Sequence, residues 1–391
     1  MLNFTDLTQE TFLNEYWQKK PLLIKNALPN FESQLSGDEI AGLAMDEELD
    51  SKLVIENPNS KTDWQIKKGP LSESDFQSLP KSHWTCLVHG IDRVIPPISQ
   101  LFDHFNFIPH WRIDDIMISV SGLHGNVGPH YDNYDVFLFQ AEGKKKWSLT
   151  TKDCHAKNHI PDIDLRIMSS FEIEQEFILE EGDMLYLPAH VGHHGVSLSE
   201  LCMTYSFGYR SYQLQELWDS LGDFLSENAA GQALYQDPNW QSLINSAEIT
   251  HAPVAQAKAL LQSVLENETV LQQWFGRFAT QLDASANQLH MLPLEDKIAD
   301  LQKQLINHIK QGATFHRDLN ARVAFSKIDQ QINLFINGEC IVIRDEDEKF
   351  IELLAFERTL SSETLRPFLK NAANQALLLS LYQQQILQVE D

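Results

Sequence analysis

Apolar residues follow two different spacings along the chain and divide it into a strand-rich part and a helical part. Between residues 112 and 210 they fall in short runs separated by glycines, which is typical of a β-sandwich or barrel. The predicted strands are 116–121, 134–140, 144–150, 184–187 and 203–209. From about residue 212 the apolar residues recur every three or four positions, as on one face of a helix. We therefore expect a barrel followed by helices.

The last hundred residues predict a small mixed module. From about residue 296 the pattern indicates two helices, a pair of strands and a further helix. The strands 332–336 and 340–343 flank Asn337-Gly338, which is a strong signal for a two-residue hairpin turn. A module of the winged-helix type fits this order of elements.

Length, composition and charge restrict the class of protein. A chain of 391 residues is too long for one ordinary hydrophobic core, so we expect two or three domains. With 43% hydrophobic residues and a net charge of -25, the chain should fold and should attract basic partners. Residues 301–391 hold ten Lys+Arg and twelve Asp+Glu, whereas a module that reads DNA should present a basic face. Direct binding of nucleic acid is therefore not expected.

The cysteines and the N-terminus point to the cytoplasm. Cys86, Cys154, Cys202 and Cys340 stand alone, without a CxxC pair, so neither a disulfide framework nor a zinc site is predicted. The first residues lack the basic and apolar regions of a signal peptide. No apolar run approaches the length of a membrane span.

The most informative segment for chemistry is 128–137. Residues two apart on a strand point to the same face, so His130 and Asp132 can reach one metal ion together. Two histidines and one carboxylate form a facial triad that leaves coordination positions open on iron(II). A single His-x-Asp triplet is common by chance and more often reflects surface polarity, so further features must support the site.

A third ligand should lie at the end of a later strand. The run 184–187 reads as a strand that Pro188 ends. His190, His193 and His194 follow it within six residues, and spacing alone leaves all three open as ligands.

Lys145 is the second supporting feature. By strand alternation it shares a face with the apolar Trp147 and Leu149, whereas Lys144 and Lys146 lie on the other face. A lysine that points inward is costly unless it meets a negative partner. The distal carboxylate of 2-oxoglutarate would be such a partner, and the alternative is an ordinary basic, solvated turn. Ser119 faces the same way as Met117 on its own strand and offers a hydroxyl for a bound carboxylate.

Four segments carry a resemblance to a known family. They are 16–24 (YWQKKPLLI), 111–119 (WRIDDIMIS), 128–137 (GPHYDNYDVF) and 185–188 (LYLP) with His193 five residues beyond the proline. The chain resembles the JmjC-type ribosomal oxygenases over nearly its whole length. Its resemblance is strongest to the bacterial members that hydroxylate an arginine in a protein of the large ribosomal subunit.

The resemblance implies roles for individual residues. It assigns iron(II) to His130, Asp132 and His193, with His194 as the runner-up for the third ligand. It places the 2-oxoglutarate carboxylate at Lys145, where relatives carry arginine or lysine, and at the hydroxyl of Ser119.

The resemblance also implies an architecture of the α+β class. Residues 1–211 would form a double-stranded β-helix (cupin/JmjC) oxygenase barrel, 212–295 a helical dimerisation region, and 296–391 a winged-helix-like domain. It further implies a cytoplasmic homodimer that acts on a basic ribosomal protein.

The activity implied is hydroxylation of a protein side chain, coupled to oxidative decarboxylation of 2-oxoglutarate. An arginine substrate needs acidic neighbours, and Asp115 on the Ser119 strand is a candidate. The alternatives within the enzyme class are a histidyl hydroxylase and a lysyl demethylase, which the mass of the product would distinguish. A winged-helix regulator of nucleic acid is opposed by the acidic module, and a metal-free scaffold is opposed by the intact triad.

Overall fold

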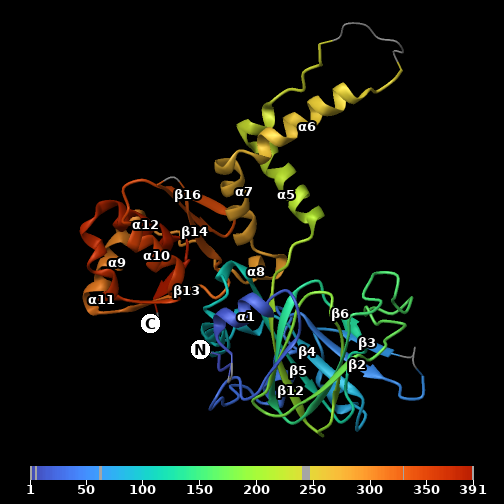
Figure 1. Cartoon of the computed structure of the whole chain (residues 1–391). Helices are drawn as coiled ribbons and strands as arrows, with labels where there is room; N and C mark the ends of the chain where they lie inside the picture. Colours follow the sequence, from blue (N-terminus) through green and yellow to red (C-terminus); the bar gives the residue numbers. More distant parts are fainter. Residues whose placement is uncertain (1, 5–6, 61–63, 240–246, 329, 390–391) are drawn as a thin grey trace. The chain divides into compact units, whose positions relative to one another are not determined.

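The computed structural model describes residues 2–4, 7–60, 64–239, 247–328 and 330–389, and Figure 1 shows its elements. The chain separates into two compact units, Met1–Ser211 and Tyr212–Asp391. Among the helices of the described ranges, none has the length and apolar character needed to cross a membrane.

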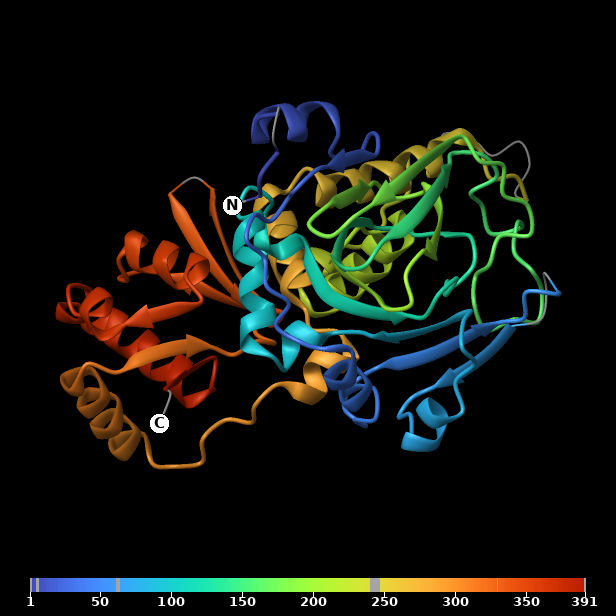
Figure 2. The same cartoon turned by 90° about the horizontal axis from the view of Figure 1, so that it is seen from below.

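The first unit is built on two antiparallel sheets, drawn from blue to green in Figures 1 and 2. The larger sheet has the order β1-β10-β7-β12-β5-β4-β2-β3, and the smaller sheet has the order β6-β11-β8-β9. The strands are β1 (Leu22–Ile24), β2 (Ser51–Glu56), β3 (Trp64–Lys68), β4 (Trp84–Val88), β5 (Ile113–Ser121), β6 (His130–Tyr131), β7 (Asp135–Glu142), β8 (Lys145–Thr150), β9 (Gln175–Leu179), β10 (Met184–Leu187), β11 (Gly192–Ser197) and β12 (Cys202–Tyr209). The helices of this unit are α1 (Gln9–Glu15), α2 (Gly37–Leu43), α3 (Glu73–Gln77) and α4 (Pro96–Ser99).

Two apolar layers hold these sheets. Alternate residues of β7 belong to different clusters: Phe137 joins the large core under the N-terminal segments, and Val136 joins a smaller core with Trp147 and Leu149 of β8. Because both faces of β7 are covered, its residues from 135 to 140 are all buried. The smaller core therefore lies among residues of both sheets, as in a double-stranded β-helix.

The strand predictions for this unit are confirmed within two or three residues at each end. The five predicted strands correspond to β5, β7, β8, β10 and β12. The β2, β3 and β4 strands, which extend the larger sheet beyond β5, were not predicted.

The second unit contains helices and two three-stranded sheets, β17-β13-β18 and β14-β15-β16. Its helices are α5 (Leu214–Glu227), α6 (His251–Leu265), α7 (Glu268–Thr280), α8 (Ala284–Leu289), α9 (Ile298–Gln311), α10 (Glu348–Phe356), α11 (Ser362–Leu365) and α12 (Ala372–Gln383). Its strands are β13 (Thr314–Arg317), β14 (Val323–Ile328), β15 (Gln331–Ile336), β16 (Glu339–Ile343), β17 (Thr359–Ser361) and β18 (Leu387–Val389).

The hairpin predicted at Asn337-Gly338 is confirmed. Both residues have positive φ angles, 49° and 84°, as a two-residue turn that follows the strand twist requires. The prediction of two helices before this hairpin is wrong, because a single helix, α9, is followed by β13 and β14. Strand β13 pairs with β17 and β18, which lie far from it in the sequence, so the local sequence pattern does not predict it.

Helix α7 packs on the β15–β16 hairpin. Arg277 Nε donates to the carbonyl of Gly338 at 2.9 Å, and the Gly338 amide donates to Thr280 Oγ1 at 3.2 Å. A Cβ atom at Gly276 would lie 2.3 Å from the Phe335 ring, so the helix approaches β15 closely. The helices before residue 296 thus share contacts with the C-terminal sheet, and the subdivision of this unit at 296 stays a prediction.

Candidate metal and cosubstrate site

His130, Asp132 and His193 come together at the end of the smaller sheet. His130 on β6 is paired directly with His193 on β11, and Asp132 follows β6. Each of the three residues offers a ligand atom, and these atoms all lie within 4.8 Å of one another. His193 Nε2 lies 3.6 Å from Asp132 Oδ2.

Backbone carbonyls fix the orientation of both imidazole rings. His130 Nδ1 lies 3.0 Å from the carbonyl oxygen of Gly128, and His193 Nδ1 lies 3.0 Å from that of Val191. A carbonyl oxygen only accepts, so each Nδ1 carries the hydrogen and each Nε2 keeps its lone pair. Burial, followed by the neighbouring His130, lowers the pKa of His193 to about 4, which keeps this ring neutral at physiological pH.

This donor set fits a divalent transition metal. Two neutral imidazoles and one carboxylate on one side of an ion leave the opposite positions open, which is the arrangement of non-haem iron(II) oxygenases. The other two candidate histidines lie outside the cluster. His194 Nε2 is 3.2 Å from Asn126 Oδ1, and His190 is an exposed turn residue whose ring lies 6.0 Å from that of Tyr131.

Lys145 is buried, as the alternation predicted, with only 5% of its surface exposed. Its ammonium lies 5.1 Å from the Trp147 ring centre and donates a long hydrogen bond of 3.4 Å to Thr204 Oγ1. Lys144 and Lys146 face outward and pair with Glu180 and Glu176, whereas no carboxylate within the described ranges pairs with Lys145. Burial lowers the pKa of Lys145, because it disfavours the charged ammonium. A bound anion beside the ammonium would offset this cost.

Two further polar groups surround Lys145. Ser119 on β5 is paired with Thr204 on β12, and both are buried. The indole Nε1 of Trp147 is buried and has no hydrogen-bond partner in the part of the chain described. Together with Lys145 these donors suit a small carboxylate. Thr204 was missed from the sequence, because its closeness to Lys145 depends on pairing between strands far apart in the chain. Trp147 was placed on the Lys145 face, but its Nε1 was not singled out as a donor.

Gly195 makes room for the Trp147 ring. The two residues are directly opposed on β11 and β8, and a Cβ atom at Gly195 would lie 2.6 Å from ring atoms of Trp147. Such a distance is far inside van der Waals contact, so only glycine allows the indole to lie flat across β11 and beneath Lys145.

A β-bulge places two carboxylates at the start of β5. Phe207 pairs with Ile116 and Tyr209 with Ile113, so Asp114 and Asp115 both lie opposite Gly208. A bulge turns a side chain away from strict alternation. The Asp132 carboxylate, followed by burial, Asp115 and Asp114, raises the pKa of Tyr134 well above its ordinary value.

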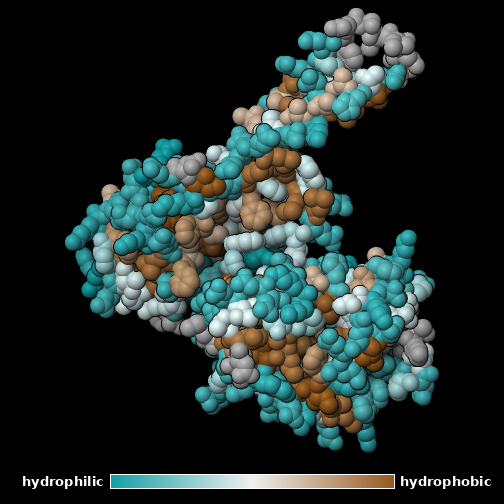
Figure 3. All heavy atoms as spheres, in the orientation of Figure 1, coloured by the Kyte–Doolittle hydropathy of each residue, from teal (hydrophilic) through white to brown (hydrophobic). Residues whose placement is uncertain are grey.

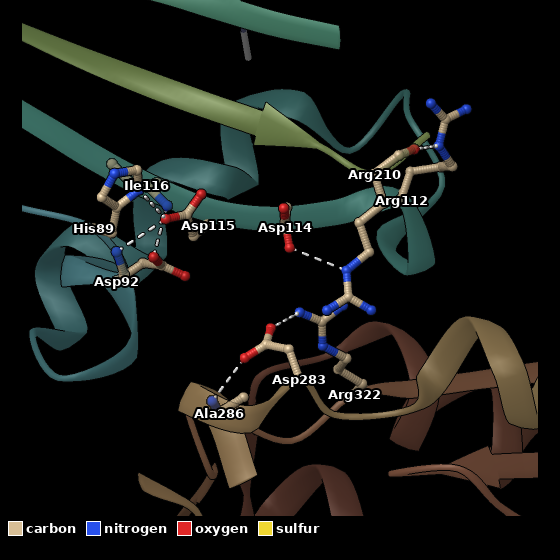
Figure 4. A network of polar contacts seen from close by, with 11 residues as sticks. His89, Asp92, Arg112, Asp114, Asp115, Ile116, Arg210, Asp283, Ala286 and Arg322 are labelled. Carbon is tan, nitrogen blue, oxygen red and sulfur yellow. Dashed lines mark hydrogen bonds and ion pairs between the residues drawn. The ribbon is translucent and has the colours of Figure 1, made fainter. Parts of the chain in front are cut away.

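The two carboxylates have different partners, which Figure 4 shows. Asp115 Oδ2 accepts from the Gly90 amide at 3.0 Å and lies 3.5 Å from His89 Nδ1, whereas Asp114 Oδ1 accepts from Arg210 Nε at 3.0 Å. Burial acts to raise the pKa of Asp115, but His89, Arg93 and the Gly90 amide outweigh it and lower that pKa. Asp115 is therefore ionised at neutral pH.

The comparisons with known proteins agree with this arrangement. Residues 100–217 match the JmjC domain family, and residues 259–388 match the ROXA-like winged helix. The ribosomal protein uL16 3-hydroxylase of Escherichia coli (strain K12) is 32% identical over 370 residues, which cover 95% of this chain and 94% of that relative.

Solved structures show the same fold. An X-ray structure of Escherichia coli YcfD has a TM-score of 0.85 and 30% identity, and covers 100% of this chain and 99% of its own. A structure of this ribosomal oxygenase with cobalt and 2-oxoglutarate has a TM-score of 0.82 and 28% identity, with 100% of both chains covered. On this identity and coverage, the chain belongs to the ribosomal oxygenases, a family of JmjC-type 2-oxoglutarate-dependent enzymes.

Proposed function

We propose that this protein is a protein hydroxylase in which His130, Asp132 and His193 hold iron(II). The observation that carries the proposal is the convergence of three ligand atoms within 4.8 Å, with both histidine Nδ1 atoms bonded to backbone carbonyls. When bound, iron(II) and 2-oxoglutarate activate dioxygen for insertion of a hydroxyl oxygen into a substrate C–H bond. The three side chains would hold the ion from one side and would leave other coordination positions for these reactants.

The proposed place of 2-oxoglutarate is beside Lys145 and Ser119, with Thr204 as a further donor. Support comes from the buried ammonium, which among the described residues has only the neutral Thr204 hydroxyl within hydrogen-bond distance. A carboxylate there would favour the charged form of Lys145 and would receive charge-assisted hydrogen bonds. The apolar residues around it, Trp147 and Leu149 among them, would exclude water from the reacting atoms.

The proposed substrate is an arginine side chain of a basic ribosomal protein. The relative from Escherichia coli is a hydroxylase of ribosomal protein uL16, and this chain covers 94% of it. Asp115, Asp114 and Asp132 all act on the pKa of Tyr134, and such a group of carboxylates suits a guanidinium substrate. The net charge of -25 favours encounter with a basic partner.

The experiment is to incubate the iron-loaded protein with uL16, 2-oxoglutarate and dioxygen and to measure the mass of uL16 peptides. An arginine peptide that gains one oxygen supports the proposal. Oxygen on a histidine peptide, or loss of a methyl group from lysine, would instead identify the histidyl hydroxylase or lysyl demethylase alternative. Asp132→Ala serves as the inactive control.

Homodimerisation through the helices of the second unit is also proposed. Figure 3 shows apolar side chains along α5 to α7. The exposed members on α5 and α6 are Leu214, Trp218, Val254, Leu261 and Leu265. Exposed apolar side chains that gather on neighbouring elements are typical of a protein–protein interface. We propose a cytoplasmic dimer without direct contact to nucleic acid, which light scattering after size-exclusion chromatography would test.

Lys145→Met should weaken 2-oxoglutarate binding without loss of the metal. The variant keeps the apolar stem but removes a charge-assisted hydrogen bond worth roughly 1.5–3 kcal/mol, so the apparent affinity should fall by about one to two orders of magnitude. A 2-oxoglutarate titration that follows succinate measures this change. Lys145→Arg should retain most of the affinity, and Lys144→Met and Lys146→Met should be nearly silent because both side chains pair on the outer face. Equal affinity for Lys145→Met and the wild type would contradict the proposed carboxylate site.

A further inference from the structure

The side chain of Asn126 is buried just before β6 and joins three segments of the first unit. Its exposed fraction is 3%. Oδ1 accepts from the Gly128 amide at 2.9 Å and from His194 Nε2 at 3.2 Å. Nδ2 donates to Glu56 Oε2 at 2.6 Å and to the His124 carbonyl at 3.1 Å. The orientation of the amide is settled by its partners, because an amide N–H only donates and carboxylate and carbonyl oxygens only accept.

These bonds lead directly to a proposed metal ligand. Gly128 has a φ of +77°, and its carbonyl accepts from His130 Nδ1 at 3.0 Å. Asn126 holds the amide of the same glycine, so it restricts the backbone turn that aims this carbonyl at the imidazole. Glu56 ends β2 of the larger sheet and holds Asn126 in turn by a short, charge-assisted bond.

The same set of bonds fixes the orientation of the His194 ring. Because Asn126 Oδ1 accepts from it, His194 Nε2 carries the hydrogen, and this ring is turned toward Asn126 and away from a role as ligand. His194 follows the proposed ligand His193 on β11, so its bond to Asn126 links the loop before β6 to the strand that carries the third ligand.

We infer that Asn126, anchored by Glu56, is a positioning residue for the metal site: it orients His130 through Gly128 and ties the His130 loop to β11 through His194. The inference rests on the proposed function of His130 and His193 as metal ligands. Groups that orient ligating histidines typically change metal affinity by about 10–100-fold when they are removed.

The test is a cobalt(II) titration of the full chain, followed by visible absorption and without 2-oxoglutarate. Asn126→Ala should lower cobalt affinity by about 10–100-fold. The matched control is Asn374→Ala, since Asn374 is a fully buried asparagine of the second unit that bonds Asp347 and Phe368. This control should lower the unfolding temperature but leave cobalt affinity unchanged.

Exchanging the donor and the acceptor of the Asn126–Glu56 hydrogen bond separates the loss of this bond from general damage to the fold. In Asn126→Asp two acceptor oxygens would face each other where Nδ2 now lies 2.6 Å from Glu56 Oε2, so affinity should fall at least as far as in Asn126→Ala. In the double variant Asn126→Asp with Glu56→Gln, the new amide at position 56 donates to the new carboxylate at position 126, so one donor again faces one acceptor. This variant should recover part of the lost cobalt affinity. A purely structural defect at 126 predicts no recovery.

The outcomes distinguish this inference from the proposed function. If the wild type fails to bind cobalt, or Asp132→Ala binds it equally well, the metal assignment itself is wrong. If Asp132→Ala loses cobalt while Asn126→Ala binds as the wild type does, the positioning role is overturned. Should Asn126→Ala not fold, Glu56→Ala takes its place, since it keeps the asparagine but removes the bond that fixes the orientation of the Asn126 amide toward Gly128 and His194. A fall of severalfold is expected for Glu56→Ala, and unchanged affinity would equally overturn the inference.

Discussion

Asp132→Ala is expected to reduce 2-oxoglutarate turnover to background while the protein stays folded. The carboxylate is the anionic member of the proposed triad, and its loss leaves two neutral imidazoles to hold a divalent cation. The side chain is 21% exposed and lies outside the apolar clusters, so the fold does not depend on it. Succinate formation and the unfolding temperature of the metal-free variant measure the two effects. Turnover near the wild-type level would contradict the triad.

The neighbouring histidines provide the controls for this prediction. His193→Ala should be inactive in the same assay, because its Nε2 faces Asp132. His190→Ala and His194→Ala should keep most of the activity at saturating iron(II), since the first residue is exposed and the second only ties the His130 loop to β11 through Asn126. An inactive His194→Ala beside an active His193→Ala would show that the third ligand is the adjacent residue.

Arg112→Met is expected to destabilise the first unit by about 3–5 kcal/mol, because it leaves a buried charge without its partner. Arg112 Nη2 donates to Asp135 Oδ2 at 3.0 Å, and the Asp135 side chain is fully buried. Tyr186, Gln18 and Ser211 also donate to this carboxylate, but all three are neutral. The change in free energy of unfolding in urea measures the effect.

Arg210→Met is the matched control. Arg210 and Arg112 have similar side-chain exposures, 14% and 11%, but the Asp114 partner of Arg210 is 37% exposed. An ion pair of that kind contributes about 0–1 kcal/mol. The double variant Arg112→Met with Asp135→Asn should regain part of the stability, because the unpaired charge is gone. Equal losses for Arg112→Met and Arg210→Met would show that burial of Asp135 is not the cause.

The parts of the molecule that local pattern determines were predicted well. Lys145 is inward because side chains alternate along a strand that also carries Trp147, and the Asn337-Gly338 turn follows from the freedom of both residues to adopt positive φ. His130 and Asp132 were identified by the same alternation, and the resemblance selected His193 from three histidines.

Contacts between side chains on strands that are far apart in the sequence could not be predicted from local pattern. Thr204 meets Lys145 only because β12 pairs with β5 and β7, and Asp114 departs from alternation only because a bulge forms opposite Gly208. The bonds of Asn126 to Glu56 and His194 span 70 and 68 residues of chain, and no spacing rule reaches across such distances.

The contact between Gly195 and Trp147 restricts how this protein can change in evolution. Any side chain at position 195 would displace an indole that packs against Lys145 and whose Nε1 has no hydrogen-bond partner among the described residues. A mutation at 195 would therefore act on the surroundings of Lys145 through the Trp147 ring. A larger residue there becomes acceptable only after a smaller one has replaced Trp147. The two positions should vary together, and the order of the two substitutions should decide whether the intermediate protein keeps an aromatic ring beside Lys145.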